Sequence, residues 1–192
     1  MIELNLQTQT LQKLLELIDN SNDFLGYTLN LEAGTISDKL NSNSMRDTSE
    51  KHIQIFAALL CHYALANPTP LSGKLVKFKD IPGGYAYQGA FVQRAIQPVA
   101  EVFGEKPEEL LKAARLIGGL RLNLGDSSVE INALKGIPLT YILWKADEFP
   151  ASATILYDAS ASNYLPTEDL AVLGELTTSR LIDAKKYLNF EE

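Results

Sequence analysis

The stretch from residue 120 to residue 158 constrains the fold most strongly. It contains four short segments in which apolar and polar residues alternate, separated by turns: GLRLNL, SSVEINAL, GIPLTYILW and SATILYDA. A period of two predicts β-strands, and strands with such short connections pair with their sequence neighbours in antiparallel fashion. The sequence therefore predicts an antiparallel β-meander.

Helices are predicted before and after this stretch. The segment HIQIFAALLCHYALA, within residues 50–66, is apolar nearly all the way round, which is typical of a helix buried at the centre of a domain. A C-terminal helix is predicted after Pro166, where apolar residues from Leu170 to Leu188 recur at helical spacing. We therefore expect the α+β class, with one domain over residues 1–192 in which the meander sheet packs against a buried central helix and a C-terminal helix.

Shorter elements are predicted in the remaining segments. Apolar residues at helical spacing predict a helix over residues 11–18, and alternation on both sides of Gly34 predicts a β-hairpin. Residues 91–103 have helical character, but Pro98 lacks a backbone N–H and should kink or divide this helix. A further helix should end at Gly118-Gly119, because glycine commonly follows the last helical turn.

Charge and hydropathy argue against two classes of partner. The formal net charge is −7, which disfavours nucleic acid, because phosphate contacts depend on clustered lysine and arginine. No run of 18 apolar residues occurs, and the N-terminus has no basic start followed by an apolar core. We therefore expect a cytoplasmic protein that binds neither nucleic acid nor membrane.

Residues that hold metals and redox groups are scarce. The chain has one cysteine, Cys61, whereas an internal disulfide, an iron–sulfur cluster or a structural zinc site needs several. His52 and His62 lie on one predicted helix, and their separation corresponds to about 15 Å of helical rise, too far to share an ion. We therefore predict no metal and no cofactor.

Acidic residues near the C-terminus suggest a carboxylate site. If the strands around them pair as a hairpin, Asp147 and Glu148 lie at its turn and Asp158 lies about 17 Å away at the far end. Asp158 and Ser160 have the spacing of a calcium loop, but the glycine and the bidentate glutamate of that loop are missing. Signature motifs for nucleotide binding, serine hydrolysis and zinc catalysis are absent as well, so no catalytic residue is assigned.

The segment KFKDIPGGYAYQGAFVQR, residues 77–94, is predicted to bind a ligand. Two lysines alternate onto one face of a strand, a Pro-Gly-Gly turn exposes backbone N–H groups, and tyrosines flank that turn. Such a cluster would hold a small anionic molecule or the acidic face of a protein partner. The predicted binding residues are Lys77, Lys79, Gly83, Gly84, Tyr85, Tyr87 and Arg94. In the alternative interpretation the lysines protect an edge strand, the tyrosines pack, and Arg94 pairs with Glu101.

Most of the chain resembles a known family. The segments HYALA, PLSGKLVKFKDIPGGYAY, AARLIGG and GIPLTYILWKADEFPASATILYDASASNYLPTEDLAVL resemble a family of uncharacterised proteins of anaerobic bacteria and archaea, known as a domain of unknown function. Some members carry an additional four-cysteine iron–sulfur domain similar to that of corrinoid one-carbon proteins. The chain has no such cysteines, so any redox role of those members does not transfer. The resemblance implies a link to anaerobic cofactor or one-carbon metabolism, and it supplies no catalytic residues.

Three functions remain open at this point. The first is a binding or accessory module for a small anionic molecule or an acidic protein partner. The second is an enzyme without a recognisable motif, which would use scattered carboxylates such as Asp80, Asp147 and Asp158 if folding brings them together. The third is a structural or assembly protein, for which a homodimer and a large apolar surface patch would be the indicators.

Overall fold

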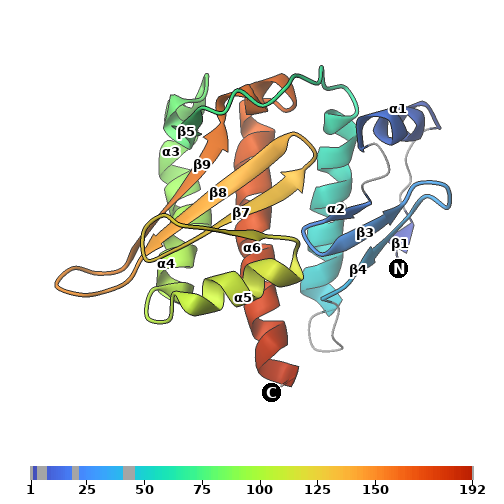
Figure 1. Ribbon diagram of the computed structural model, residues 1–192. Coiled ribbons are helices and arrows are strands. Elements are labelled where there is room, and N and C mark those ends of the chain that lie inside the picture. Colours follow the sequence, from blue (N-terminus) through green and yellow to red (C-terminus); the bar gives the residue numbers. More distant parts are fainter. Residues whose placement is uncertain (1, 4–7, 19–21, 41–45, 192) are drawn as a thin grey trace.

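A five-stranded antiparallel sheet forms the main body of the protein. Figure 1 shows the computed structural model, which describes residues 2–3, 8–18, 22–40 and 46–191. The strand order is β5-β9-β8-β7-β6, which confirms the predicted meander and the α+β class. Its strands are β5 (Leu75–Lys77), β6 (Leu120–Leu122), β7 (Ser127–Leu134), β8 (Ile137–Trp144) and β9 (Ser152–Asp158).

Register in the sheet is set by short turns and by alternating burial. Only two residues connect β7 to β8, and the second of them, Gly136, has a φ of +81°, a conformation that favours glycine in a tight hairpin. Tyr141 on β8 faces Ile155 on β9 across the ladder. Both side chains are buried on the face that packs against helices.

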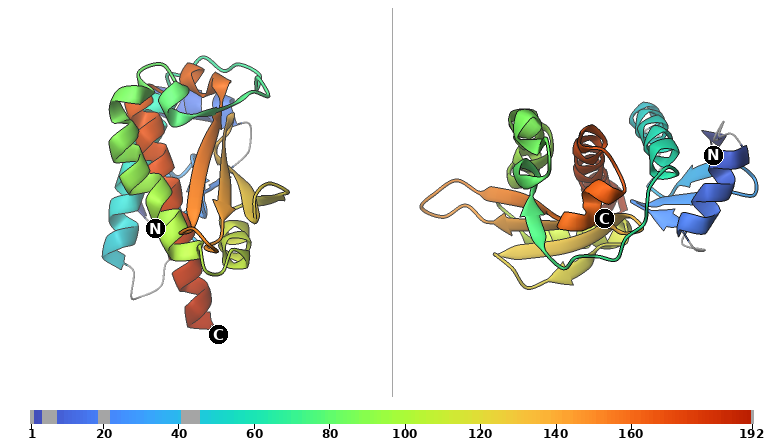
Figure 2. Two further views of the ribbon diagram at one scale, coloured as in Figure 1. Left: turned by 90° about the vertical axis from the view of Figure 1, so that its left-hand side faces the viewer. Right: turned by 90° about the horizontal axis from the view of Figure 1, so that it is seen from above.

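The long C-terminal helix lies along the middle of that face. Figure 2 shows α6 (Thr167–Glu191) between two other helical segments on the same side of the sheet. Two tyrosine hydroxyls from the sheet donate to α6 carbonyls: Tyr141 to Gly174 O at 3.3 Å and Tyr157 to Leu170 O at 2.7 Å. These bonds connect sheet and helix inside the core, where an unpaired hydroxyl would be costly.

The position of α2 (Arg46–Tyr63) differs from the prediction in one respect. This helix lies beside α6, and over residues 50–63 only one of its faces is buried, whereas α6 is the helix at the centre of the layer. Leu65, just beyond its last turn, is 69% exposed. Several of the apolar residues in this segment are alanines, and an alanine on the outer face of a helix costs little in water.

The helix predicted over residues 91–103 begins earlier and continues through Pro98. It consists of α3 (Gly84–Phe91), a π-helical turn (Val92–Ile96) and α4 (Gln97–Phe103), followed by α5 (Glu108–Leu116). The Gln97 N–H donates to Val92 O, five residues back. A proline ring would clash with the carbonyl four residues before it, and the wider π turn is the local adjustment that precedes Pro98.

A small second sheet packs near α2 at the N-terminal end of the chain. Its antiparallel order is β1-β4-β3-β2, and it confirms the hairpin predicted around Gly34. Its strands are β1 (Ile2–Glu3), β2 (Asp23–Phe24), β3 (Tyr27–Asn30) and β4 (Thr35–Asp38), and the predicted helix is α1 (Thr8–Ile18). Buried residues from both sheets belong to one continuous hydrophobic cluster.

Candidate functional site

The structure distributes the predicted binding residues over four elements, with Gly83 in the turn between two of them. Lys77 ends the edge strand β5, whereas Lys79 lies in a 3₁₀ turn (Phe78–Asp80), so the two lysines do not share a strand face as predicted. Gly83, with a φ of +80°, directly precedes α3, which starts at Gly84. The edge position of β5 agrees with the alternative interpretation, in which lysines protect an exposed strand edge.

The two tyrosines and the arginine of this set lie in different surroundings. Tyr85 and Tyr87 lie in the first turn of α3, directly after the turn at Pro82 and Gly83. Tyr87 donates a hydrogen bond of 2.7 Å to Glu168 on α6, which raises the pKa of Tyr87. Arg94 lies in the π turn, about 15 Å along the helix from Gly84 at ~1.5 Å per residue, and its guanidinium is 3.7 Å from Glu175. The helix therefore separates Arg94 from the other residues, and ligand binding by this set stays a prediction.

Two of the predicted scattered carboxylates, Asp147 and Asp158, do not converge. The β8–β9 ladder places Asp147 in the hairpin loop and Asp158 at the opposite end of β9, as the sequence predicted. Asp158 is buried and accepts five hydrogen bonds from Ser72, Gly73 and Ser160. None of the hollows described below is lined by Asp80, Asp147 or Asp158.

Glu175 lines a hollow of about 520 Å³ between α2 and α6. Burial raises the pKa of Glu175 in this hollow, although the Arg94 guanidinium opposes the shift. His52 from α2 lines the same space, and its Nδ1 is 3.2 Å from the buried carboxylate of Asp183. Glu175 and His52 thus each have an oppositely charged or chargeable neighbour of their own, and we assign no reaction to them.

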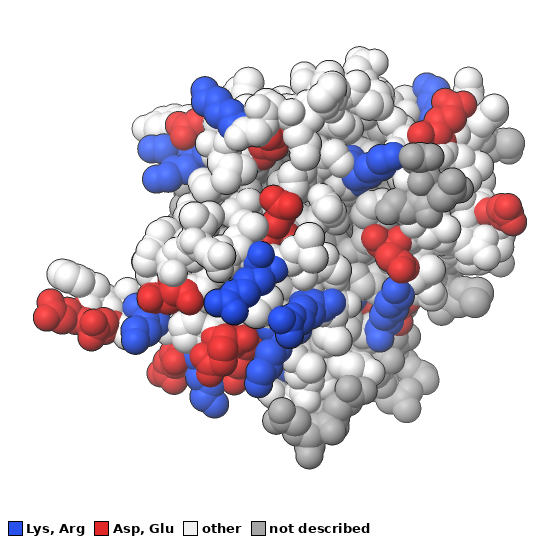
Figure 3. Space-filling model, in the orientation of Figure 1, with Lys and Arg blue, Asp and Glu red and all other residues white. Residues whose placement is uncertain are grey.

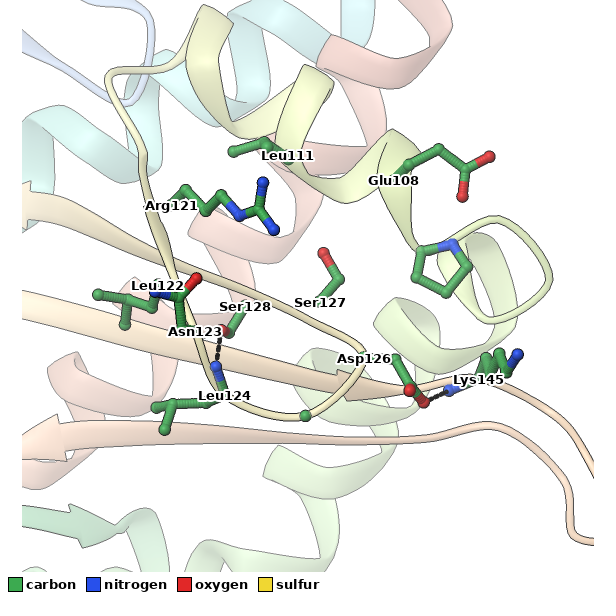
Figure 4. Close-up of a pocket in the computed structure, with 12 residues that line it drawn as sticks. Glu108, Leu111, Arg121, Leu122, Asn123, Leu124, Asp126, Ser127, Ser128 and Lys145 are labelled. Atoms are coloured by element: carbon green, nitrogen blue, oxygen red, sulfur yellow. Dashed lines mark hydrogen bonds between the residues drawn. The ribbon is translucent and has the colours of Figure 1, made fainter.

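A larger hollow lies at the end of the meander, between the β6–β7 turn and the start of α5. Its volume is about 550 Å³, and Figure 4 shows the side chains around it. We call it the Arg121 hollow, after the charged side chain of β6 that enters it. Its lining comes from α5, β6, the β6–β7 turn, β7 and the residue after β8: Pro107, Glu108, Leu111, Arg121, Leu122, Asn123, Leu124, Gly125, Asp126, Ser127, Ser128 and Lys145.

Backbone contacts hold the β6–β7 turn against β8. The Asp126 N–H donates to Leu143 O at 2.9 Å, and the Asp126 carboxylate accepts from the Lys145 N–H at 2.8 Å. Gly125 has a φ of +57°, and a Cβ there would lie 2.9 Å from the same carbonyl of Leu143. The wall of the Arg121 hollow is therefore a rigid turn rather than an open loop.

The two basic side chains that line the Arg121 hollow have no partners in the described part of the protein. In Figure 4 the Arg121 guanidinium and the Ser127 hydroxyl point into the space between the turn and α5, whereas the Glu108 carboxylate points away from Arg121. Within the described ranges, neither Arg121 nor Lys145 has an ion pair or a side-chain hydrogen bond. Figure 3 shows that charged side chains of both signs crowd this part of the surface. An unpaired guanidinium beside a hydroxyl is suited to a carboxylate or phosphate group.

Sequence reasoning did not identify Arg121, Ser127 or Lys145. These residues come from three different strands or strand ends, and only the folded sheet places them around one space. The one sequence signal was the alternation of β6, which places Arg121 on the polar side of its strand.

Fold and site together define an α+β protein with a meander sheet, a long helix on one face and a polar hollow at the end of the sheet. Residues 23–180 match the family described as a domain of unknown function (DUF3786), and the chain belongs to this family. The match confirms the resemblance to a domain of unknown function. Searches of curated proteins and of solved structures give no significant match. Among the helices in the described ranges, none combines the length and the apolar character that crossing a membrane requires.

Proposed function

We propose that this protein is a binding module that holds a small anionic molecule in the Arg121 hollow. One observation carries the proposal: the Arg121 guanidinium points into the hollow beside the Ser127 hydroxyl and has no partner among the described residues. The chain as a whole carries a formal net charge of −7, so an unpaired cation in a hollow is a local exception to its overall charge. No reaction is part of the proposal.

The lining suggests what kind of molecule would fit. A guanidinium offers several N–H donors in one plane and can bind a carboxylate or phosphate through two parallel hydrogen bonds. Leu111, Leu122 and Leu124 supply apolar walls around this polar group. A ligand with an acidic group on a partly apolar body satisfies both kinds of surface, as is usual for small-molecule sites.

Thermal unfolding in the presence of anionic compounds tests the proposal. The screen should include carboxylate- and phosphate-bearing cofactors of anaerobic one-carbon metabolism, because the family resemblance suggests that setting. A ligand that binds only the native state must raise the midpoint of unfolding. We expect at least one compound to do so for the wild type and to lose most of its effect with Arg121→Gln or Ser127→Ala.

Two matched variants distinguish binding in the Arg121 hollow from binding elsewhere on the protein surface. Arg115→Gln removes the same charge from an exposed position on α5 outside the hollow and should leave the response unchanged. Lys77→Gln with Lys79→Gln tests the set predicted from sequence. If Arg121→Gln responds like the wild type, or if no compound shifts the wild type, the proposed site is wrong; loss of the response only in the lysine variant would instead support the set predicted from sequence.

A protein partner at the same end of the sheet is the second candidate, and a specific observation favours it. Leu124 in the β6–β7 turn, Trp144 at the end of β8 and Phe149 in the β8–β9 loop are exposed, with Phe149 77% exposed. Large apolar side chains gathered on one surface commonly mark contact sites. Light scattering would detect self-association, and Phe149→Ser should reduce any association that depends on this surface while leaving the binding of small anions intact.

A further inference from the structure

A histidine–aspartate pair lies at the opposite end of the helical layer from the Arg121 hollow. His62 near the end of α2 and Asp169 in the first turn of α6 are separated by 107 positions in sequence, and His62 Nδ1 is 2.6 Å from Asp169 Oδ2. Figure 1 shows that these two helix ends lie at the same end of the molecule. The pair is thus created by the packing of α2 beside α6.

The contact determines how the imidazole ring presents its nitrogens. An aspartate carboxylate is a hydrogen-bond acceptor, so a neutral His62 places its proton on Nδ1 and leaves Nε2 as an acceptor. The Asp169 side chain is 15% exposed, whereas the His62 side chain is 57% exposed. The carboxylate is therefore the shielded, orienting member of the pair, and the ring is the member that a ligand can reach.

A groove of about 450 Å³ runs beside His62, between the end of α2 and the segment that leads into α6. Leu65, Leu165 and Pro166 give it apolar walls, and Asn67 and Asn163 add polar groups. The Asn67 N–H donates to Asn163 O at 3.3 Å, which connects its two sides. The groove thus combines apolar walls with the nitrogen acceptor of His62.

We infer that His62 and Asp169 form a binding site for a small aromatic molecule with a phenolic O–H, whose ring lies in the groove and whose hydroxyl donates to His62 Nε2. A phenol matches both parts of the site, since its ring is apolar and its O–H is a strong donor to imidazole. A fully ionised carboxylate or phosphate has no O–H to donate to Nε2, and His62 already occupies Oδ2 of Asp169. This inference is independent of the anion proposed for the Arg121 hollow.

A pair of related probes isolates the hydrogen bond. 4-Methylphenol has the O–H and stays un-ionised at neutral pH, and 4-methylanisole replaces the O–H with a methyl ether of similar shape. Binding is measured by NMR through the ring signals of the histidines, of which the chain has two. We expect 4-methylphenol to shift the His62 signal in a saturable manner and to bind roughly tenfold more tightly than 4-methylanisole, as one added hydrogen bond allows.

Four variants locate the site. In Asp169→Asn an amide replaces the carboxylate and can donate to Nδ1, which moves the ring proton to Nε2; 4-methylphenol should then bind no better than 4-methylanisole. His62→Gln should have the same effect if Asp169→Asn does not fold. Leu65→Ser should weaken both probes, because it removes an apolar wall, and His52→Gln should weaken neither. The inference is overturned if neither probe binds saturably, if both bind wild type equally, if Asp169→Asn or His62→Gln keeps the preference for the phenol, or if Leu65→Ser has no effect.

Discussion

At the scale of single residues, Asp158 connects two segments of the chain. Its carboxylate accepts from the Ser72 N–H and hydroxyl, the Gly73 N–H, and the Ser160 N–H and hydroxyl, at distances of 2.6 to 2.9 Å. Burial alone would raise the pKa of Asp158, but the hydrogen bonds from Ser160 and Ser72 outweigh it and hold the pKa well below that of an ordinary aspartate. The Asp158 carboxylate, which was a candidate for catalysis, therefore holds the segment before β5 in place.

Replacing Asp158 with asparagine should destabilise the protein by about 2 to 4 kcal/mol at neutral pH, because five N–H and O–H donors, including the buried pair on Ser160, lose a charged acceptor. Since the folded-state pKa is lowered, the ionised carboxylate contributes fully above about pH 4 and loses its contribution as the pH falls further toward the folded-state pKa. The difference between wild type and Asp158→Asn should therefore shrink between about pH 4 and pH 2. Urea unfolding at several pH values measures it.

The control for this prediction is Asp147→Asn in the exposed β8–β9 loop. It makes the same chemical change and should alter stability by less than about 0.5 kcal/mol. An equal effect of the two variants at neutral pH, or a constant difference down to pH 2, would show that Asp158 does not have this role.

At the scale of elements, the approach of α6 to the sheet depends on a missing side chain. A Cβ on Gly174 would lie 2.5 Å from the Tyr157 hydroxyl and 2.6 Å from the ring of Phe91. Glycine lowers helix propensity, so its presence in the middle of α6 has a packing reason. Gly174 lets one helix touch both a strand tyrosine and a neighbouring helix.

Two glycine-to-alanine changes should therefore have opposite signs. Gly174→Ala should lower the free energy of unfolding by about 1 to 3 kcal/mol through overpacking. Gly89→Ala, on the exposed face of α3 where a Cβ would meet nothing within 4 Å, should raise it by roughly 0.5 to 1 kcal/mol through helix propensity. Chemical denaturation of both variants measures the two changes, and changes of the same sign would contradict a packing role for Gly174.

At the scale of the whole molecule, Arg180 connects the central helix to the N-terminal sheet. Its side chain is 1% exposed, its Nε donates to Leu25 O at 3.0 Å, and its two terminal nitrogens bind both oxygens of Asp38 at 2.5 and 3.1 Å. The guanidinium also lies 4.2 Å from the centre of the Tyr27 ring. One buried cation thus contacts both β3 and β4 and the segment before them.

Arg180→Met should destabilise the protein by about 3 to 5 kcal/mol, because it leaves the Asp38 carboxylate buried without its cation. Arg180→Lys should also be destabilising, since an ammonium cannot reproduce the two parallel bonds to Asp38 or the contact with Tyr27. Adding Asp38→Asn to Arg180→Met should cost less than the sum of the single changes, because the charge is then gone. Denaturant unfolding of the single and double variants measures this coupling, and additive effects would argue against it.

Local periodicity in the sequence determined most elements of this protein. Alternation in residues 120–158 was sufficient for the four strands of the meander, and the lysines of the segment before them marked β5 as an edge strand. The same hairpin register separated Asp147 from Asp158. These features depend on neighbours in the chain, and side-chain direction along a strand repeats every two residues.

The tertiary structure alone decided which elements meet. Helical periodicity could not tell that α6 rather than α2 occupies the centre of the layer, because both have apolar faces and differ in what covers them. The sequence also predicted Arg94 beside Lys77 and Lys79, but the length of α3 separates Arg94 from these lysines. The Arg121 hollow and the pair of His62 with Asp169 join segments far apart in sequence. Their convergence follows from packing, which no local period encodes.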